Sequence, residues 1–285
     1  MTDLDHRGLV ARAERLDRAV AAMQARFAPM FPGGEIQDIG RAIWTLSTTP
    51  LLVANGVIRY DARDFYGPES ERDLDCCLAV LSTYDVPWRF SAWEHLGADL
   101  LMPHLVARGM IGTAKARAMW LDVRGRVATT VGEDGIEIRP ATNACDHHLW
   151  TQIFINVFGI PSEYADVFEV MVATSHSFSA VAYVHGQPAG CLSMAIEDGV
   201  AVVDNIGVLP SLRRRGVGRR LLEAAHEGAA ARGAKACVVV ATPEGTGICA
   251  RLGYHVVTSV TYLMAPASTA LTDQQRRLAY QPTLP

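Results

Sequence analysis

The amino-acid sequence predicts an α/β protein built on a mixed sheet, and three observations support this fold class. Short β-type runs alternate along the chain with stretches whose apolar residues recur at helical spacing. Apolar residues make up 49% and charged residues 20% of the 285 residues, so a packed core is expected and disorder is not. One β-type run, 201–208, passes through a glycine-rich turn directly into a helix-periodic run.

In the first half of the chain, helix-periodic and β-type runs follow one another. Residues 8–27 predict an amphipathic helix that ends at the prolines and glycines of 29–34. Two further helices are expected, one at 70–82 with Ser70 as its N-cap and one at 98–110 interrupted by Pro103. The strands expected between these helices are 42–47, 55–60, 86–93 and 118–123.

The second half contains the stretch that points to a chemistry, IGVLPSLRRRGVGR at 206–219. After Pro210 an arginine and two glycines follow in the spacing R-x-x-G-x-G, and a helix-periodic run begins at Val217. The first amides of a helix have no internal partners and carry partial positive charge. Glycines let the backbone approach a pyrophosphate closely, and the neighbouring arginines attract it. The stretch therefore predicts an anion site.

The spacing identifies the class of phosphate ligand. A nucleotide P-loop needs G-x-x-x-x-G-K-[ST] and a dinucleotide site needs G-x-G-x-x-G, and neither pattern fits. R-x-x-G-x-G after V-x-P resembles the acetyl-CoA signature of the GNAT N-acetyltransferase superfamily. Three other stretches agree in order with that family's first strand, central hairpin and final "rlGF" motif: IEIRPAT (136–142), AVAYVHGQPAGCLSMAIEDG (180–199, turn at His185–Gly186) and RLGY (251–254). The resemblance covers roughly residues 135–265 and implies an acyl-CoA N-acyltransferase fold.

The first half repeats the order of the second. NGVIRY, VPWRFSAW and HLVARGM stand where AVVDNIGV, ACVVVA and CARLGYH stand later, which suggests a weak internal duplication. The connecting segment DARDFYGPESERD (61–73) is acidic and would repel pyrophosphate. We therefore expect a degenerate GNAT-like lobe at 1–134 and a GNAT acetyltransferase domain at 135–285, with 124–135 as linker. An unrelated α/β domain at 1–134 is the alternative.

The resemblance implies acetyl-CoA as co-substrate, and no metal is expected. The CDHH stretch at 145–148 lacks the second pair of ligands that a metal site requires. The resemblance also implies that backbone groups near the end of the 201–208 strand bind the pantetheine arm and polarise the thioester carbonyl. The residues expected at the cofactor are Ile206, Gly207, Val208, Arg213, Arg214, Arg215, Gly216, Val217, Gly218 and Arg219.

Two residues are candidates for proton transfer. Asp204, on the same strand, is the best-placed general base, and its alternative is a strand-surface residue facing solvent. Glu197 and Asp198 are weaker candidates that fit an ordinary turn. Many family members have a tyrosine in "lYerlGF" that protonates the leaving thiolate, and that position here is Cys249, a doubtful acid and a good buried small hydrophobe. Either another group serves as the acid, or none does, or transfer has been lost.

We therefore predict acetyl transfer from acetyl-CoA to an amine of a small molecule by direct attack, since no nucleophile for a covalent intermediate is evident. The alternatives are a non-catalytic acyl-CoA-binding or regulatory protein and a GNAT-fold enzyme of other acyl-CoA chemistry, such as decarboxylation.

Composition limits the partners and the compartment. A net charge of −4 argues against nucleic-acid binding. No apolar run reaches the roughly 18 residues that span a bilayer, and the start MTDLDHRGLV is unlike a signal peptide. Six cysteines without framework spacing are typical of reduced thiols in the cytoplasm. We expect a cytoplasmic monomer or homodimer whose partners are acyl-CoA and an amine acceptor.

Overall fold

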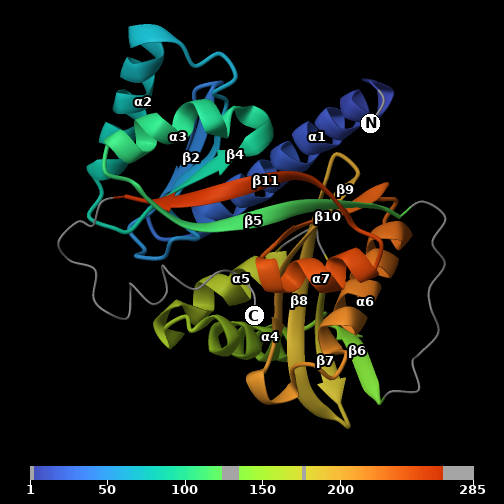
Figure 1. Ribbon diagram of the computed structural model, residues 1–285. Helices are drawn as coiled ribbons and strands as arrows, with labels where there is room; N and C mark the ends of the chain where they lie inside the picture. The colour runs from blue at the N-terminus through green and yellow to red at the C-terminus, as the bar shows by residue number, and fades with distance from the viewer. Residues whose placement is uncertain (1–2, 124–134, 175–177, 266–285) are drawn as a thin grey trace. The chain divides into compact units, whose positions relative to one another are not determined.

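Figure 1 shows a computed structural model of the chain, which describes residues 3–123, 135–174 and 178–265. Contacts within the chain divide these residues into two compact units. The first unit combines 3–117 with 257–265, and the second consists of the described residues of 118–256. Apart from Gly135, the expected linker 124–135 lies outside the described residues.

The first unit contains a sheet in the order β1-β2-β3-β4-β11-β5. Strand β3 is antiparallel to β2 and parallel to β4, and β11 is antiparallel to β4. Its strands are β1 (Glu35–Asp38), β2 (Ala42–Leu46), β3 (Gly56–Tyr60), β4 (Arg89–Trp93), the first part of β5 (Ile111–Asp122) and most of β11 (His255–Met264). Its helices are α1 (Asp3–Phe27), α2 (Gly67–Ser82) and α3 (Ala98–Ala107).

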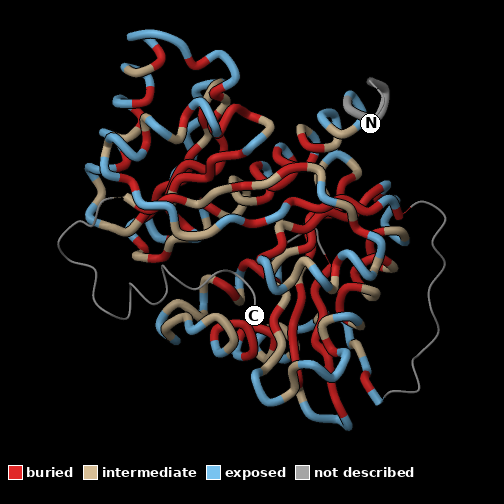
Figure 2. The backbone as a smooth tube through the Cα atoms, in the orientation of Figure 1, coloured by how far each residue is buried: buried red, intermediate tan, exposed pale blue. Residues whose placement is uncertain are grey.

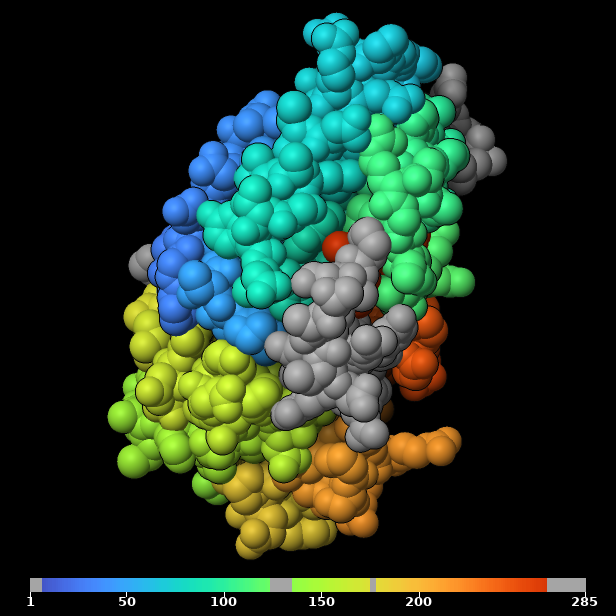
Figure 3. All heavy atoms as spheres, turned by 90° about the vertical axis from the view of Figure 1, so that its left-hand side faces the viewer, coloured from blue at the N-terminus to red at the C-terminus, as the bar shows by residue number. Residues whose placement is uncertain are grey.

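The core of the first unit forms where α2 and α3 bury their apolar faces against the sheet. Leu74 and Leu81 of α2 and Leu105 of α3 are fully buried and share a cluster with Phe90 of β4. Helix α1 packs on β2 and β3. Figure 2 shows buried residues concentrated along the strands, and Figure 3 shows the solvent-facing side of the segment from α2 to β5 in cyan to green.

The second unit has a sheet in the order β5-β10-β9-β8-β7-β6, to which β5 contributes its second part. The other strands are β6 (Ile136–Pro140), β7 (Phe178–Val184), β8 (Gln187–Glu197), β9 (Val200–Val208) and β10 (Ala236–Ala241). Strands β6 to β9 are antiparallel neighbours, and β10 is parallel to β9. The helices are α4 (Ala144–Phe158), α5 (Ala165–Thr174), α6 (Val217–Ala231) and α7 (Pro243–Arg251).

Local sequence signals account for the main elements of this unit. The predicted turn between β7 and β8 is confirmed, because His185 and Gly186 both have positive φ, as a two-residue hairpin turn of type I′ requires. The apolar stripe of α6 is buried against β7, β8 and β9. Helix α4 buries Trp150, whose indole Nε1 donates to the carbonyl oxygen of Leu192 at 2.8 Å. These packing contacts hold β8 and β9 between their helices.

Three expectations differ from the structure. Helix α2 begins at Gly67, so Ser70 is not its N-cap but a buried residue of its first turn. Helix α3 runs through Pro103 without interruption. Strand β1 was not expected, and β5 begins seven residues earlier than predicted. All of β1 and most of the first part of β5 lack buried apolar residues, so the sequence pattern does not reveal them as strands. Grouping by contacts places most of β11 in the first unit and the second part of β5 in the second unit.

The predicted mixed α/β fold class is confirmed. Among the helices that the structure describes, none is both long enough and apolar enough to cross a membrane.

Candidate functional site

Strands β9 and β10 separate soon after they begin. Their parallel pairing joins Val200–Val202 to Ala236–Val238, although β9 continues to Val208 and β10 to Ala241. Backbone N–H and C=O groups are obligatory hydrogen-bonding groups, so a strand edge that diverges from its neighbour offers them to another partner. The second half of β9 is therefore an edge at which an extended ligand with amide groups can bind.

A β-bulge in β9 lies within this diverging segment. Cys191 of β8 pairs with Gly207, whereas Ser193 pairs with Asp204, so β9 contains one extra residue between these two pairs. Asn205 takes up the bulge in the left-handed region, at φ 52°, which asparagine tolerates better than most residues. Its side-chain Nδ2 donates to Ser193 Oγ at 2.9 Å. The side-chain bond holds the bulge in place.

The bulge decides which way the following side chains point. Ala201 and Val203 belong to the core under α6, and Ile206 and Val208 pack against the same core. By strand alternation, the half-buried Asp204 lies on the opposite face. Asp204 is therefore placed on the diverging strand, as predicted, but on the side of the sheet away from α6.

The arginine-rich turn joins β9 to α6 through two residues with left-handed backbone. Arg213 donates from Nε to the carbonyl oxygen of Val208 at 3.1 Å and so ties the turn to the end of the strand. Arg214 has φ 62° and Gly216, the N-cap of α6, has φ 89°. As a glycine, Gly216 has no side chain with which to cap the helix start. Successive amides in such a turn, at a helix N-terminus, form a concave site for an anion.

The glycines of the site serve different purposes. Gly216 needs its positive φ, whereas a Cβ built on Gly218 would meet only ordinary contacts at 3.7 Å and 3.8 Å, with Ile248 and Val208. Protein packing therefore does not require glycine at 218, and close approach of a ligand would. Gly207 is different, because a Cβ there would lie 3.0 Å from Val157 of α4.

The arginines divide into two groups. The side chains of Arg219 and Arg220 donate to Glu223 at 2.7 Å and 2.9 Å. Burial alone would raise the pKa of Glu223, but these hydrogen bonds lower it below its usual value. Arg214 and Arg215 are exposed, and within the described part of the chain neither has an ion-pair partner within 4 Å. Their charge is available to a phosphate group.

Cys249 lies buried in α7, in the same apolar cluster as Tyr254. Burial raises the pKa of its thiol to about 11, so it holds its proton at neutral pH. Tyr254 packs in the core as predicted, and its hydroxyl lies 2.9 Å from Nε2 of the buried His226.

The other candidates do not form a centre. Asp198 has φ 48° between β8 and β9, as expected of a turn residue. At the start of α4, Asn143 Oδ1 accepts from the Asp146 backbone N–H at 3.1 Å, and His148 pairs with Glu169 at 2.6 Å. Within 3–123, 135–174 and 178–265, no group of three or more His, Cys, Asp or Glu residues is arranged to hold a metal ion.

Asn205 and Ser193 are not among the site residues that the sequence predicted. The available signal was an asparagine inside an apolar strand, where it is unfavourable unless the backbone leaves the regular strand conformation.

Comparison with known proteins agrees with this geometry. Residues 146–254 match the model of the acetyltransferase (GNAT) family. This part of the chain is a GNAT-family domain. The matched range extends from α4 to the residue before β11 and contains the diverging strands, the bulge and the arginine-rich turn. No curated protein sequence matches the chain.

Solved structures extend the likeness of fold beyond the GNAT domain. A GCN5-related N-acetyltransferase from Kribbella flavida has a TM-score of 0.64 at 17% identity, over 87% of this chain and 95% of that one. One from Sphaerobacter thermophilus has a TM-score of 0.61 at 15% identity, over 80% and 81%. A tandem GNAT protein from the clavulanic acid biosynthesis pathway has a TM-score of 0.61 at 14% identity, over 87% and 89%. At such identities the likeness concerns the fold alone.

Proposed function

We propose that this protein transfers an acetyl group from acetyl-CoA to an amine of a small molecule. The observation that carries the proposal is that a diverging strand edge leads directly into a helix start that suits an anion. The strand edge where β9 leaves β10 leads, through Arg213 and the left-handed turn, into the uncapped start of α6. An extended amide-containing arm that ends in a pyrophosphate is the ligand that uses both features.

The cofactor would bind from β9 to the start of α6. Backbone groups of Ile206, Gly207 and Val208 would bond the pantetheine amides. The backbone of 214–219, with Gly216, Val217 and Gly218 at its centre, would hold the pyrophosphate. Arg214 and Arg215 would supply charge directly, whereas Arg213 would act by fixing the turn and Arg219 is partly neutralised by Glu223.

The proposed reaction is a direct displacement. The amine nitrogen attacks the thioester carbonyl carbon, the carbonyl electrons move onto oxygen, and a backbone N–H near Ile206 would stabilise that oxyanion by about 3 kcal/mol. The C–S bond then breaks, and the amine proton passes to a base. Asp204 is the proposed base, acting directly or through water, with an expected contribution of about 10²–10⁴-fold.

The leaving thiolate needs no contribution from Cys249. A buried thiol with a pKa raised to about 11 is a poor proton donor at neutral pH. We propose that the CoA thiolate leaves without an acid from this position.

The burial of Cys249 favours a second candidate, a protein that binds acyl-CoA without turnover. The family's tyrosine position holds a thiol that is fully packed in the core, so one usual component of the transfer machinery is missing. The two candidates share the cofactor site and differ in whether an acceptor is consumed.

We also propose the cellular setting. The six cysteines all lie in described parts of the chain and none of them forms a disulfide there, which fits a reducing compartment such as the cytoplasm. The expected partners are acyl-CoA and the amine, with the protein acting as a monomer or homodimer.

Two measurements on the full chain test the proposal. Calorimetry with acetyl-CoA should detect binding that falls sharply in Gly218→Val, whereas Gly112→Val, outside the site and with nothing within 4 Å of its Cβ, should bind like the natural protein. Thiol release from acetyl-CoA should then depend on an amine from a panel and fall in Asp204→Asn. Binding without release on any amine would select the second candidate, and unchanged affinity in Gly218→Val would refute the site.

A further inference from the structure

The first unit repeats the strand arrangement of the proposed cofactor site. Strand β3 is antiparallel to β2 with a register shift at Ile43/Trp44, which leaves one extra residue, Ile58, on β3. Its parallel pairing with β4 covers only Gly56–Val57 and Arg89–Phe90, after which the two strands diverge. A bulged strand that leaves its parallel neighbour after two residues is the counterpart of β9 leaving β10 after three.

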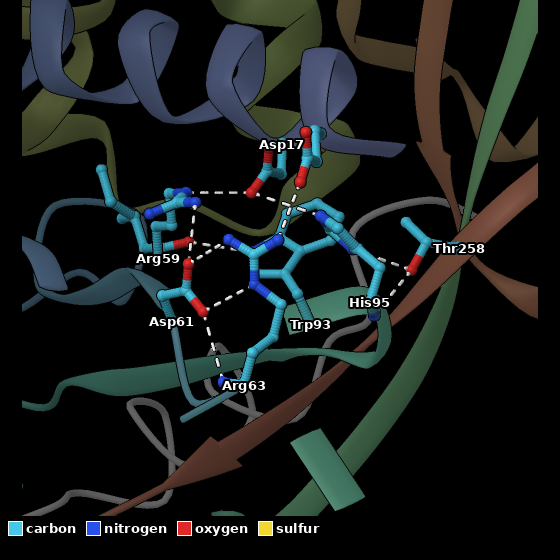
Figure 4. A network of polar contacts seen from close by, with 9 residues as sticks. Asp17, Arg59, Asp61, Arg63, Trp93, His95 and Thr258 are labelled. Atoms are coloured by element: carbon cyan, nitrogen blue, oxygen red, sulfur yellow. Dashed lines mark hydrogen bonds and ion pairs between the residues drawn. The ribbon is translucent and has the colours of Figure 1, made fainter. Parts of the chain in front are cut away.

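The opening between β3 and β4 is filled by the protein itself. The side chain of Trp93, the last residue of β4, is 2% exposed. Its indole Nε1 donates to the carbonyl oxygen of Ile58, the bulge residue, at 3.0 Å. Figure 4 shows Trp93 of β4 together with Arg59 of β3 and with Asp61, which follows β3. A backbone carbonyl on the diverging edge of β3 therefore already has its donor.

A network of polar side-chain contacts lies around this opening. Arg59 of β3 donates from Nε to Asp17 of α1 at 2.9 Å, and both side chains are buried. His95, directly after β4, has Nε2 at 3.4 Å from the same carboxylate and Nδ1 at 3.0 Å from Thr258 Oγ. The segments that follow β3 and β4 come together again beyond the two strands. There the N–H of Ala62 donates to the carbonyl oxygen of Leu96 at 2.8 Å.

The helix that follows β3 has a glycine at its start but no free anion site. Gly67, at the start of α2, has φ 71°, comparable with Gly216 before α6. Pro68, however, has no backbone N–H to offer, and Glu69 brings negative charge into the first turn. The Tyr66 N–H already donates to Ser70 Oγ at 3.1 Å. The start of α2 therefore keeps the glycine conformation of the turn before α6, but not the free amides and the positive charge that a pyrophosphate needs.

We propose that the first unit contains a second, self-occupied cofactor groove in which Trp93 takes the place of an acyl-CoA pantetheine arm. This inference rests on the proposed function, because it assumes that acyl-CoA binds along β9 in the second unit. The chain then binds one acyl-CoA, and the first unit is a scaffold. The groove, once emptied of its indole, is a site for a small planar apolar molecule with one N–H donor.

Binding stoichiometry tests the first half of this inference without altering Trp93. Calorimetry should give one acetyl-CoA per chain, and Gly218→Val should abolish binding rather than halve the stoichiometry. Two equivalents per chain, or one remaining equivalent in Gly218→Val that is lost on changing Ile58 or Trp93, would overturn it. Absence of any binding to the natural protein would instead refute the proposed function.

Chemical rescue tests the second half independently of acetyl-CoA. The Trp93→Gly variant should have a lower Tm than the natural protein, and free indole should raise that Tm. We expect 1-methylindole, which has no N–H, to bind about 10-fold more weakly, because the bond to the Ile58 carbonyl is lost.

Trp93→Phe is the matched control, since it keeps an apolar ring in the groove and should show no response to indole. If Trp93→Gly does not fold, Trp93→Ala carries the same test. Equal rescue by both indoles, or rescue of Trp93→Phe, would overturn the assignment of Trp93 as the specific occupant.

Discussion

Arg213 donates from its Nε to the carbonyl oxygen of Val208 at 3.1 Å. This bond joins the last residue of β9 to the turn before α6 and is made by a half-buried side chain, whereas Arg214 and Arg215 are exposed. The three consecutive arginines therefore have different tasks, one holding the turn and two offering charge.

The first prediction separates these tasks. Arg213→Ala should weaken acetyl-CoA binding by loosening the turn, with little change in how affinity depends on salt. Arg215→Ala should lower the affinity for acetyl-CoA because it removes an exposed charge. The affinity of this variant should then depend less steeply on salt concentration than that of the natural protein. Calorimetry at two ionic strengths distinguishes the two, and identical salt slopes for both variants would contradict the division.

The second prediction compares two glycines. Gly218→Ala should change the free energy of unfolding by no more than about 0.5 kcal/mol, because its Cβ meets only contacts of 3.7 Å and longer. The same variant should nevertheless bind acetyl-CoA more weakly than the natural protein. Gly207→Ala should destabilise the fold by about 1–3 kcal/mol, because its Cβ would lie 3.0 Å from Val157. Chemical denaturation and calorimetry on both variants check this, and a destabilised Gly218→Ala would show that packing requires that glycine.

The third prediction concerns the bulge in β9. Asn205→Ala should destabilise the bulge twice, by losing the bond to Ser193 and by placing an alanine at φ 52°. Asn205→Gly relieves the backbone strain and loses only the bond, so it should resemble Ser193→Ala. We expect a larger loss of acetyl transfer rate than of acetyl-CoA affinity in all three variants. Equal stability of the alanine and glycine variants would argue against strain at this position.

The fourth prediction uses the cysteines. Cys76 and Cys145 are exposed and the other four are buried. A thiol reagent at neutral pH should therefore modify two thiols quickly and the other four only after unfolding. A third fast thiol in the folded protein that disappears in Cys249→Ala would contradict the buried position of Cys249.

The fifth prediction is a pH dependence of stability. Burial holds the pKa of Cys249 at about 11 in the folded protein, against about 8.5 for an unfolded thiol. Between these values the unfolded chain has lost the proton that the folded chain keeps, so the free energy of unfolding falls as pH rises. Denaturation from pH 8 to 11 should show a shallower fall in Cys249→Ala than in the natural protein, and parallel curves would contradict the prediction.

Sequence patterns predicted the elements whose signals are local. The stripe of α6 and the β7–β8 turn were recognisable because helical spacing and positive-φ turn residues act within a few positions of the chain. Strand β1 and the first part of β5 were not, because their residues are mostly exposed and lack apolar alternation. The bulge at Asn205 depends on Ser193 across the sheet, a partner that no local pattern names.

The sequence by itself determined the mixed α/β class, the order of elements in the second half and the position of the arginine-rich turn. Those features arise from neighbouring residues and from backbone preferences of glycine and proline. Only the tertiary structure decided that β11 pairs with β4, that β9 and β10 diverge, and that Trp93 fills the matching opening in the first unit. Strand partners and groove occupants are chosen by long-range packing and by which backbone groups still need a hydrogen bond, and neither is encoded in local periodicity.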